Sequence, residues 1–177
     1  MAHPIDALDL ALLEALRDHP RAGDLELSRL LSVARATVQS RLARLEHAGV
    51  VRGWSPQVSL EASGFGVSAF VSLEIAQGAL DSVREELLGI PGVVEAFVTT
   101  GTSDVLCRVA AAHHAGLQDV LLDLNRSGSV VRSTSVMVLS TLIEPRVLPL
   151  LATTAADRSP RAPAYRGTVD TGSATTA

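Results

Sequence analysis

Apolar residues recur at helical spacing through the first part of the chain and switch to alternation after Gly64. Residues 5–18 carry an apolar stripe that predicts an amphipathic helix, formed by Ile5, Leu8, Leu12 and Ala15. The acidic residues of this segment are expected outside the stripe: Asp6, Asp9 and Glu14. Pro20 and Gly23 end the helix, and a second, short helix is predicted over 25–31 with Asp24 as its cap.

A third helix is predicted over residues 35–48, where Val38, Leu42 and Leu45 share one face. Gly49 suits a left-handed C-cap, and the chain from Val50 to Leu60 is expected to be extended. Three short helices followed by a strand-like segment are typical of a helix-turn-helix unit.

The pattern after Gly64 predicts strands and helices in alternation. In the first strand, 65–75, the odd-numbered positions are apolar or Ala, and a helix 79–88, strands 93–100 and 104–111, a helix 115–126 and a strand 129–143 follow. This β-α-β-β-α-β order predicts a four-stranded antiparallel sheet with both helices on one face. The other face carries apolar side chains that need a partner, so two chains are expected to meet sheet to sheet.

These segments predict two domains and a tail. Residues 1–60 are expected to form the helix-turn-helix domain with an extended arm, and residues 61–148 the αβ-sandwich. Residues 149–177 are rich in Ala, Thr, Ser and Pro without apolar periodicity, and we expect them to be disordered. The predicted fold class is α+β, with a winged-helix type of helix-turn-helix followed by a ferredoxin-like sandwich.

Composition and charge exclude several classes of protein. The chain is 47% hydrophobic and 19% charged, which is typical of a globular protein. No apolar run approaches the length of a membrane span and no signal peptide is recognisable, so a cytoplasmic protein is expected. The single cysteine, Cys107, excludes an intramolecular disulfide framework. No metal or cofactor is expected, because the adjacent His113 and His114 would point to opposite faces of a strand.

Positive charge is concentrated in and after the third predicted helix. Between residues 33 and 60, four arginines face a single acidic residue, Glu46. In a helix-turn-helix the second helix of the pair enters the major groove of double-stranded DNA, with its N-terminal residues at the base edges. We expect DNA contacts from Arg35, Thr37, Gln39, Ser40, Arg41, Arg44 and Arg52, the last two with phosphates. The alternative is an ordinary solvated helix face.

Two of these arginines, Arg41 and Arg44, lie off the apolar stripe of Val38, Leu42 and Leu45. Their replacement by alanine is therefore expected to weaken DNA binding without unfolding the protein.

The turn Thr100-Gly101-Thr102-Ser103-Asp104 is a candidate small-molecule site. Its hydroxyls and backbone amides suit a small zwitterion, with Asp104 pairing with the ammonium group. From local sequence alone, a plain hairpin turn in which Asp104 caps its own backbone is favoured over that site.

Three segments in this order resemble the leucine-responsive and asparagine-regulator (Lrp/AsnC, feast/famine) transcription regulators over residues 5–148. They are IDALDLALLEALRDHPRAGDLELSRLL, VQSRLARLEHAGVVRGW and TTGTSDVLCRV. The resemblance implies a DNA-binding regulator whose sandwich domain binds an effector, usually an amino acid, between dimers. It also implies homodimers through the sheets, with assembly up to octamers.

The resemblance carries effector-site roles onto the turn and two further positions: Gly101, Thr102, Ser103 and Asp104, with Leu124 and Thr134 as neighbours. This chain departs from the family before the third helix, where Ser32-Val33-Ala34 replaces the common Gly-Leu-Ser. The usual N-cap serine is therefore Ala34, and losing a cap costs about 1 kcal/mol.

Two other functions stay open at this point. Some proteins similar to this family are decarboxylases of sirohaem-type tetrapyrroles, and Arg108, His113 and His114 fit that interpretation. It leaves the arginine-rich third helix unexplained. The other alternative is a module that senses a metabolite without binding DNA.

Overall fold

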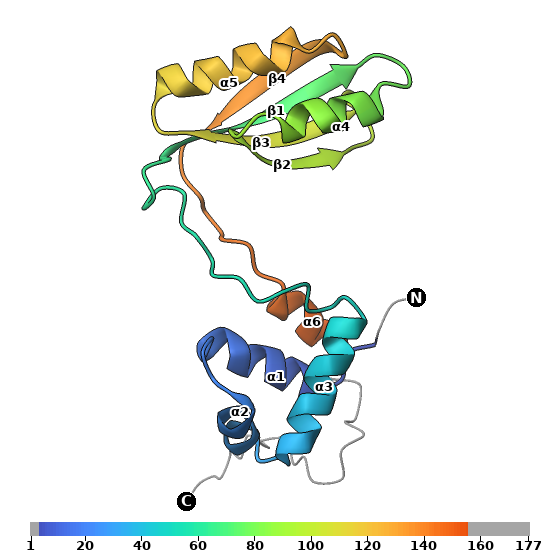
Figure 1. The fold of residues 1–177 in the computed structure, drawn as a ribbon, viewed down its shortest axis with the longest axis vertical. Helices are drawn as coiled ribbons and strands as arrows, with labels where there is room; N and C mark the ends of the chain where they lie inside the picture. The colour runs from blue at the N-terminus through green and yellow to red at the C-terminus, as the bar shows by residue number, and fades with distance from the viewer. Residues whose placement is uncertain (1–3, 156–177) are drawn as a thin grey trace, which may run out of the picture. The chain divides into compact units, whose positions relative to one another are not determined.

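The computed structural model describes residues 4–155 and divides them into two compact units (Figure 1). The first unit contains the chain up to Ser55 together with the segment from Glu144 onward. The second contains Pro56–Ile143.

Three helices form most of the first unit, as the spacing predicted: α1 (Ala7–Asp18), α2 (Asp24–Leu30) and α3 (Arg35–His47). Their apolar stripes meet in one small core of fully buried side chains: Leu12, Leu27, Val38 and Leu45. The second helix begins one residue earlier than predicted, because Gly23 and not Asp24 is its N-cap. Asp24 is therefore the first helical residue, where a negative charge favours the helix dipole.

The turn between α2 and α3 is less favourable than the usual helix-turn-helix turn. Ser32 lies in the left-handed region at φ 53°, a conformation in which glycine is not strained. Ala34 is the N-cap of α3 and makes no side-chain capping bond, as its sequence predicted. The last turn of α3 is regular, with Gly49 at φ 69° after it.

The predicted extended segment after α3 is present, but no strand is assigned between residues 50 and 60. The backbone there has no neighbouring strand to pair with, so the wing of a winged helix is not formed. Trp54, in this segment, donates its indole N–H to Glu46 Oε1 at 2.7 Å and so holds the extended chain against the end of α3.

The second unit is the predicted β-α-β-β-α-β sandwich, built from β1 (Val67–Ile75), α4 (Leu80–Leu88), β2 (Val93–Val98), β3 (Val105–Ala111), α5 (His114–Arg126) and β4 (Val130–Val138). The antiparallel sheet has the strand order β2-β3-β1-β4, and both helices cover the same face (Figure 1). This arrangement confirms the predicted fold class.

The core of the sandwich lies between that sheet face and the two helices. Odd-numbered residues of β1 and β3 point into it, as the alternation predicted: Ala69, Val71, Leu73, Val105, Cys107 and Val109. Helices α4 and α5 contribute Val83, Leu87, Leu117 and Leu124. Burial raises the pKa of the Cys107 thiol to about 11, so this thiol stays protonated.

Two expectations about the end of the chain need correction. Strand β4 ends at Val138 and not at 143, because its partner β1 begins at Val67 and offers no backbone beyond that point. The tail expected to be disordered from 149 onward instead begins with a helix, α6 (Leu148–Ala155), packed against α1. Residues 156–177 of that tail lie outside the described residues.

Helix α6 forms because apolar and small residues can bury against α1, with Ala155 fully buried. Its proline, Pro149, occupies the first turn, where no helical hydrogen bond is lost. Across residues 4–155, no helix is both long and apolar enough to cross a membrane.

Candidate DNA-binding and effector sites

Helix α3 presents a polar face away from the core of the first unit. Arg35, Gln39 and Ser40 are exposed and Thr37 is half-buried. Arg52, in the extended segment after the helix, is also exposed. These five residues keep the accessibility that contacts with a base edge or a phosphate require.

Two residues of this face converge on one carboxylate of α2. Gln39 donates its side-chain N–H to Asp24 Oδ2 at 2.7 Å. The Arg35 guanidinium lies 3.9 Å from the same oxygen. Asp24 is therefore a polar link between α2 and the exposed face of α3, a role the sequence reasoning did not assign because it treated Asp24 as a cap alone.

Arg41 is not on the exposed face, which corrects the prediction that it contacts bases. It is only 8% exposed, and its Nη1 lies 2.5 Å from Asp6 Oδ2 and 2.9 Å from Asp9 Oδ1. A guanidinium held by two buried carboxylates is not available to DNA. These buried ion pairs lead us to expect that Arg41→Ala destabilises the first unit, in place of the sequence-based expectation that it leaves the fold intact.

Arg44 has a mixed position. Its Nη2 lies 2.6 Å from Asp9 Oδ2, and its Nε is buried without a hydrogen-bond partner among the described residues. The side chain keeps 39% of its surface exposed, unlike that of Arg41. Arg44 thus anchors α3 to α1, and only its outer edge can meet a phosphate.

The partners of these arginines, Asp6 and Asp9, were expected outside the buried face and are both buried. They form a capping box at the start of α1, each accepting the other's backbone N–H. Burial acts to raise the pKa of Asp6, but the Arg41 hydrogen bond, the Asp9 backbone N–H and the charges of Arg41 and Arg44 together lower it. The spacing of two acids three residues apart at a helix start was the pattern that could have indicated this box.

The predicted turn of 100–104 forms the tip of the β2–β3 hairpin. Gly101 has φ 115°, which favours glycine. Thr99 closes the loop by donating its backbone N–H to the Asp104 carbonyl and its hydroxyl to the Ser103 carbonyl, both at 2.9 Å. Gly101, Thr102 and Asp104 are exposed and Ser103 is half-buried.

Asp104 binds the end of a third strand. Its backbone N–H donates to the Leu73 carbonyl at 2.9 Å, and its Oδ2 accepts the Ile75 N–H at 2.8 Å. The Ile75 N–H is free for this bond because the pairing of β1 with β3 ends at Leu73 and Val105, so β3 offers it no backbone partner. Asp104 thus does not cap its own hairpin, and its other carboxylate oxygen makes no hydrogen bond with the described residues.

The two predicted neighbours of this loop lie in different places. Leu124 is fully buried in the core between α5 and the sheet, so it cannot touch a ligand on the surface, and its predicted effector role is wrong. Thr134 is exposed and pairs with Ser72, a position on the sheet face opposite the helices.

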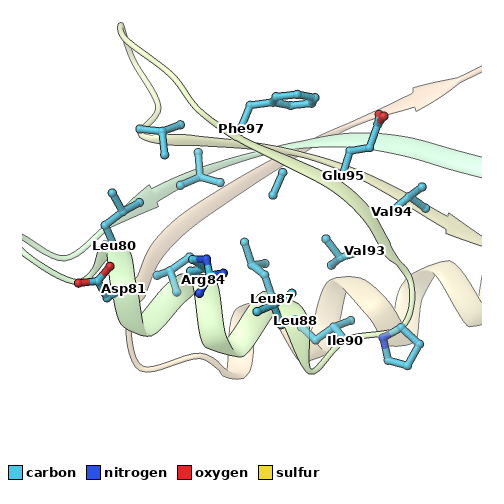
Figure 2. Close-up of a pocket in the computed structure, with 15 residues that line it drawn as sticks. Leu80, Asp81, Arg84, Leu87, Leu88, Ile90, Val93, Val94, Glu95 and Phe97 are labelled. Carbon is cyan, nitrogen blue, oxygen red and sulfur yellow. The ribbon is translucent and has the colours of Figure 1, made fainter. Parts of the chain in front are cut away.

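An apolar groove of about 490 Å³ lies beside α4 and the edge strand β2 (Figure 2). Leu80, Leu87 and Ile90 come from the helix side and Val93 and Val94 from the strand side. None of residues 101–104 lines it. The hairpin loop and this groove are therefore separate features of the second unit.

The sheet face opposite the helices is partly apolar and uncovered. Register pairs place Phe70 beside Val136 on that face, and Phe97 beside Leu106. Phe70, Phe97 and Val136 are exposed. Two ion pairs at 3.8 Å, Arg108 with Glu95 and Arg132 with Glu74, lie on the same face.

The residues that fitted the decarboxylase interpretation have other positions. His113 is the N-cap of α5, where its Nδ1 accepts the Gly116 N–H at 2.9 Å. His114 is the first residue of α5, and Arg108 pairs with Glu95 on the open sheet face. Among the described residues, no group of three or more metal-ligating side chains comes together.

Two family models match the chain. The AsnC-type helix-turn-helix domain matches residues 5–46, and the Lrp/AsnC ligand binding domain matches residues 68–148. An HTH-type transcriptional regulator of Mycobacterium tuberculosis is 33% identical over 142 residues, which cover 79% of this chain and 95% of the relative. Regulatory protein AsnC of Escherichia coli is 29% identical over 136 residues, covering 76% of this chain and 89% of that protein.

Solved structures agree in fold. Escherichia coli AsnC aligns with a TM-score of 0.77 at 26% identity, over 83% of this chain and all of that one. A Neisseria meningitidis regulator solved as an L-Met complex aligns at 0.72 and 26% identity, over 79% and 93% of the two chains. A Mycobacterium tuberculosis feast or famine regulatory protein complexed with L-methionine aligns at 0.71 and 30% identity, over 80% and 97%.

Proposed function

The chain belongs to the Lrp/AsnC family of DNA-binding transcriptional regulators, and from that premise we propose which of its surfaces bind DNA and an effector. The exposed face of α3 enters the major groove of double-stranded DNA. Arg35, Thr37, Gln39 and Ser40 contact base edges there, and Arg52 and the outer edge of Arg44 contact phosphates. The observation that carries this proposal is that these side chains stay accessible while Val38 and Leu45 of the same helix are buried.

A homodimer supplies two such helices. We propose that two chains join through the open sheet face, because Phe70, Phe97 and Val136 are exposed apolar side chains on it. Two recognition helices of a dimer bind half-sites about 34–36 Å apart or a multiple of that distance. The proposal extends to octamers of such dimers, the assembly that the family resemblance implies.

The effector site of the proposal is the β2–β3 hairpin loop, Gly101 to Asp104, with Thr134 retained as a neighbour. Two of the similar structures are complexes with L-methionine, which supports an amino acid as effector. Asp104 has one carboxylate oxygen beyond its bond to Ile75 and can pair with an ammonium group. The loop is mostly exposed and does not line the groove beside α4, so a second copy is proposed to complete the site.

The proposal makes the protein a regulator without catalytic activity that acts in the cytoplasm. The enzyme alternative is not favoured, since the relatives are named transcriptional regulators and the side chain of His113 caps a helix.

DNA selection tests the first part of the proposal. The full chain is incubated with a pool of random duplexes, and the bound fraction is sequenced. We expect enrichment of one sequence with two-fold symmetry, whose half-sites follow the spacing of a dimer. A bound fraction as random as the input would contradict sequence-specific binding.

The effector site is tested with Asp104→Ala. Gel shift on the selected DNA and light scattering are recorded for both proteins with and without L-methionine. An effector acts through its different affinity for two states, so the parent is expected to change in one assay and the variant in neither. Asp104→Asn is the matched variant: it keeps an oxygen that can accept the Ile75 N–H but carries no charge for an ammonium group, so it should stay folded and also lose the response. A variant that responds like the parent would place the site elsewhere.

A further inference from the structure

Asp24 holds a fixed position beside the proposed DNA-binding face. It is the first residue of α2, and its side chain is 31% exposed. One of its oxygens, Oδ2, accepts the Gln39 side-chain N–H at 2.7 Å and lies 3.9 Å from the Arg35 guanidinium. The carboxylate therefore touches two residues that stand one turn apart on the exposed face of α3.

The chemistry of this contact determines which end of the Gln39 amide is free. An ionised carboxylate only accepts hydrogen bonds, so the amide atom that faces Asp24 must be the NH₂ nitrogen. The amide oxygen, Oε1, is then the atom directed away from Asp24. In an unrestrained glutamine the two ends exchange freely, and the side chain can present either a donor or an acceptor.

The base edges of the major groove distinguish these two cases. Adenine N6 and cytosine N4 are amino donors, whereas guanine O6 and N7 and thymine O4 are acceptors. An amide that presents its oxygen can accept a hydrogen bond from the amino group of adenine or cytosine. Opposite guanine O6 or thymine O4 it faces another acceptor, and no hydrogen bond forms. The contact would thus distinguish adenine from guanine, or cytosine from thymine, at one position of the contacted strand.

We propose that Asp24 is a specificity-determining positioning residue: by holding the Gln39 amide nitrogen, it makes Gln39 select a base that carries an amino group. This inference rests on the proposed binding of α3 in the major groove. Asp24 itself is a negative charge close to the DNA backbone, so it also lowers affinity for any duplex. Lower general affinity together with higher discrimination is a signature that a purely structural role would not give.

The experiment repeats the selection from random duplexes with Asp24→Ala, Asp24→Asn, Gln39→Ala, the double variant Asp24→Ala/Gln39→Ala and Glu26→Ala. The base preference at each position is read from sequencing, and affinity for a duplex of unselected sequence is measured by anisotropy. Glu26 is exposed on the same helix, so its replacement removes one negative charge without touching Gln39. Thermal melting followed by circular dichroism confirms that each variant is folded.

The parent is expected to prefer adenine or cytosine at one position, and Gln39→Ala to erase that preference. Asp24→Ala should reduce it about tenfold while unselected DNA binds at least as tightly as before. The double variant should lose no more than Gln39→Ala alone, because Asp24 acts through Gln39. Asp24→Asn should lose the preference as Asp24→Ala does, because its amide can donate as well as accept and no longer fixes which end of the Gln39 amide faces it. Glu26→Ala should retain all of the preference.

An unchanged base preference in folded Asp24→Ala would overturn the inference. So would a loss of base preference at every position in Asp24→Ala, or a parent whose Gln39-dependent position prefers guanine or thymine. If the parent enriches a sequence and Asp24→Ala gives the same base preferences, this inference alone is overturned. A parent that enriches no sequence overturns the proposed function and this inference with it.

Discussion

At the residue scale, the first unit depends on ionic contacts that join α1 to α3. Arg41 lies between two carboxylates, and Asp9 also binds Arg44. Once these charges are buried, each one needs its partners, because an unpaired ion in the interior costs several kcal/mol. Arg41 and most of the Arg44 side chain, arginines of a kind that also binds DNA, thus stabilise the fold.

Arg41→Ala should destabilise the first unit by about 3–5 kcal/mol, the usual cost of removing one partner of a buried ion pair. The variant leaves the Asp6 and Asp9 carboxylates buried and unbalanced. Urea unfolding followed by circular dichroism measures this loss. Arg21→Ala, at an exposed position of the same unit, is the control and should change stability by about 0.5 kcal/mol or less. Equal stabilities of the two variants would show that the ion pairs of Arg41 do not contribute to the free energy of unfolding.

Asp6 makes the stability of the first unit depend on pH in the acid range. The folded protein holds the pKa of Asp6 below its ordinary value of 3.8, so the unfolded chain binds the proton first as pH falls. The stability contributed by the charged carboxylate is therefore complete above pH 3.8 and is lost as pH falls through the lower folded value. Unfolding midpoints between about pH 5 and about pH 2 should show this loss in the parent and less of it in Asp6→Asn. The same slope in both proteins would exclude Asp6 as its source.

Sequence reasoning could not assign these residues correctly because each role depends on a partner far along the chain. Arg41 and Asp6 are 35 residues apart. Asp104 similarly finds Ile75 at a distance of 29 residues. Spacing along one helix gives the face on which a side chain lies, and Arg41 showed that a long side chain at the margin of the apolar stripe can still be buried.

At the scale of elements, periodicity predicted most of the fold. Helical spacing located α1, α2 and α3, and alternation located β1 and β3 with the correct buried face. Ends were less accurate, since β4 ends where its antiparallel partner β1 begins. Helix α6 was missed because its composition is typical of a tail and its stability comes from packing on α1.

Helix α3 begins without a side-chain cap, and this weakness can be repaired. Ala34→Ser should stabilise the first unit by about 1 kcal/mol, because a hydroxyl at the N-cap can accept a backbone N–H of the first turn. Denaturant unfolding of the full chain measures the change. Ala43→Ser places the same hydroxyl at an exposed position in the middle of the helix, where it should give no stabilisation. A stabilisation of equal size at both positions would contradict the capping explanation.

At the scale of the whole molecule, the open sheet face determines whether the proposed dimer forms. Val136→Glu puts a charge on that face beside Phe70, and its burial in a dimer would be unfavourable. Sedimentation should show a dimer or larger assembly for the parent and a shift toward monomer for the variant. Leu122→Glu, at an exposed position on α5, is the matched control and should sediment like the parent. A variant that remains as associated as the parent would place the interface elsewhere.

The central claim is that the exposed face around α3 binds DNA, and paired charge removal tests it most directly. Affinity for the selected duplex is measured by anisotropy over a range of salt for Arg35→Ala/Arg52→Ala and for Arg84→Ala/Arg126→Ala. Both variants lose two exposed arginines, but the second pair lies in the sandwich unit. The first variant should bind at least about tenfold more weakly with a shallower salt dependence, and the second should bind like the parent. Equal affinity of the first variant and the parent at every salt concentration would contradict the account.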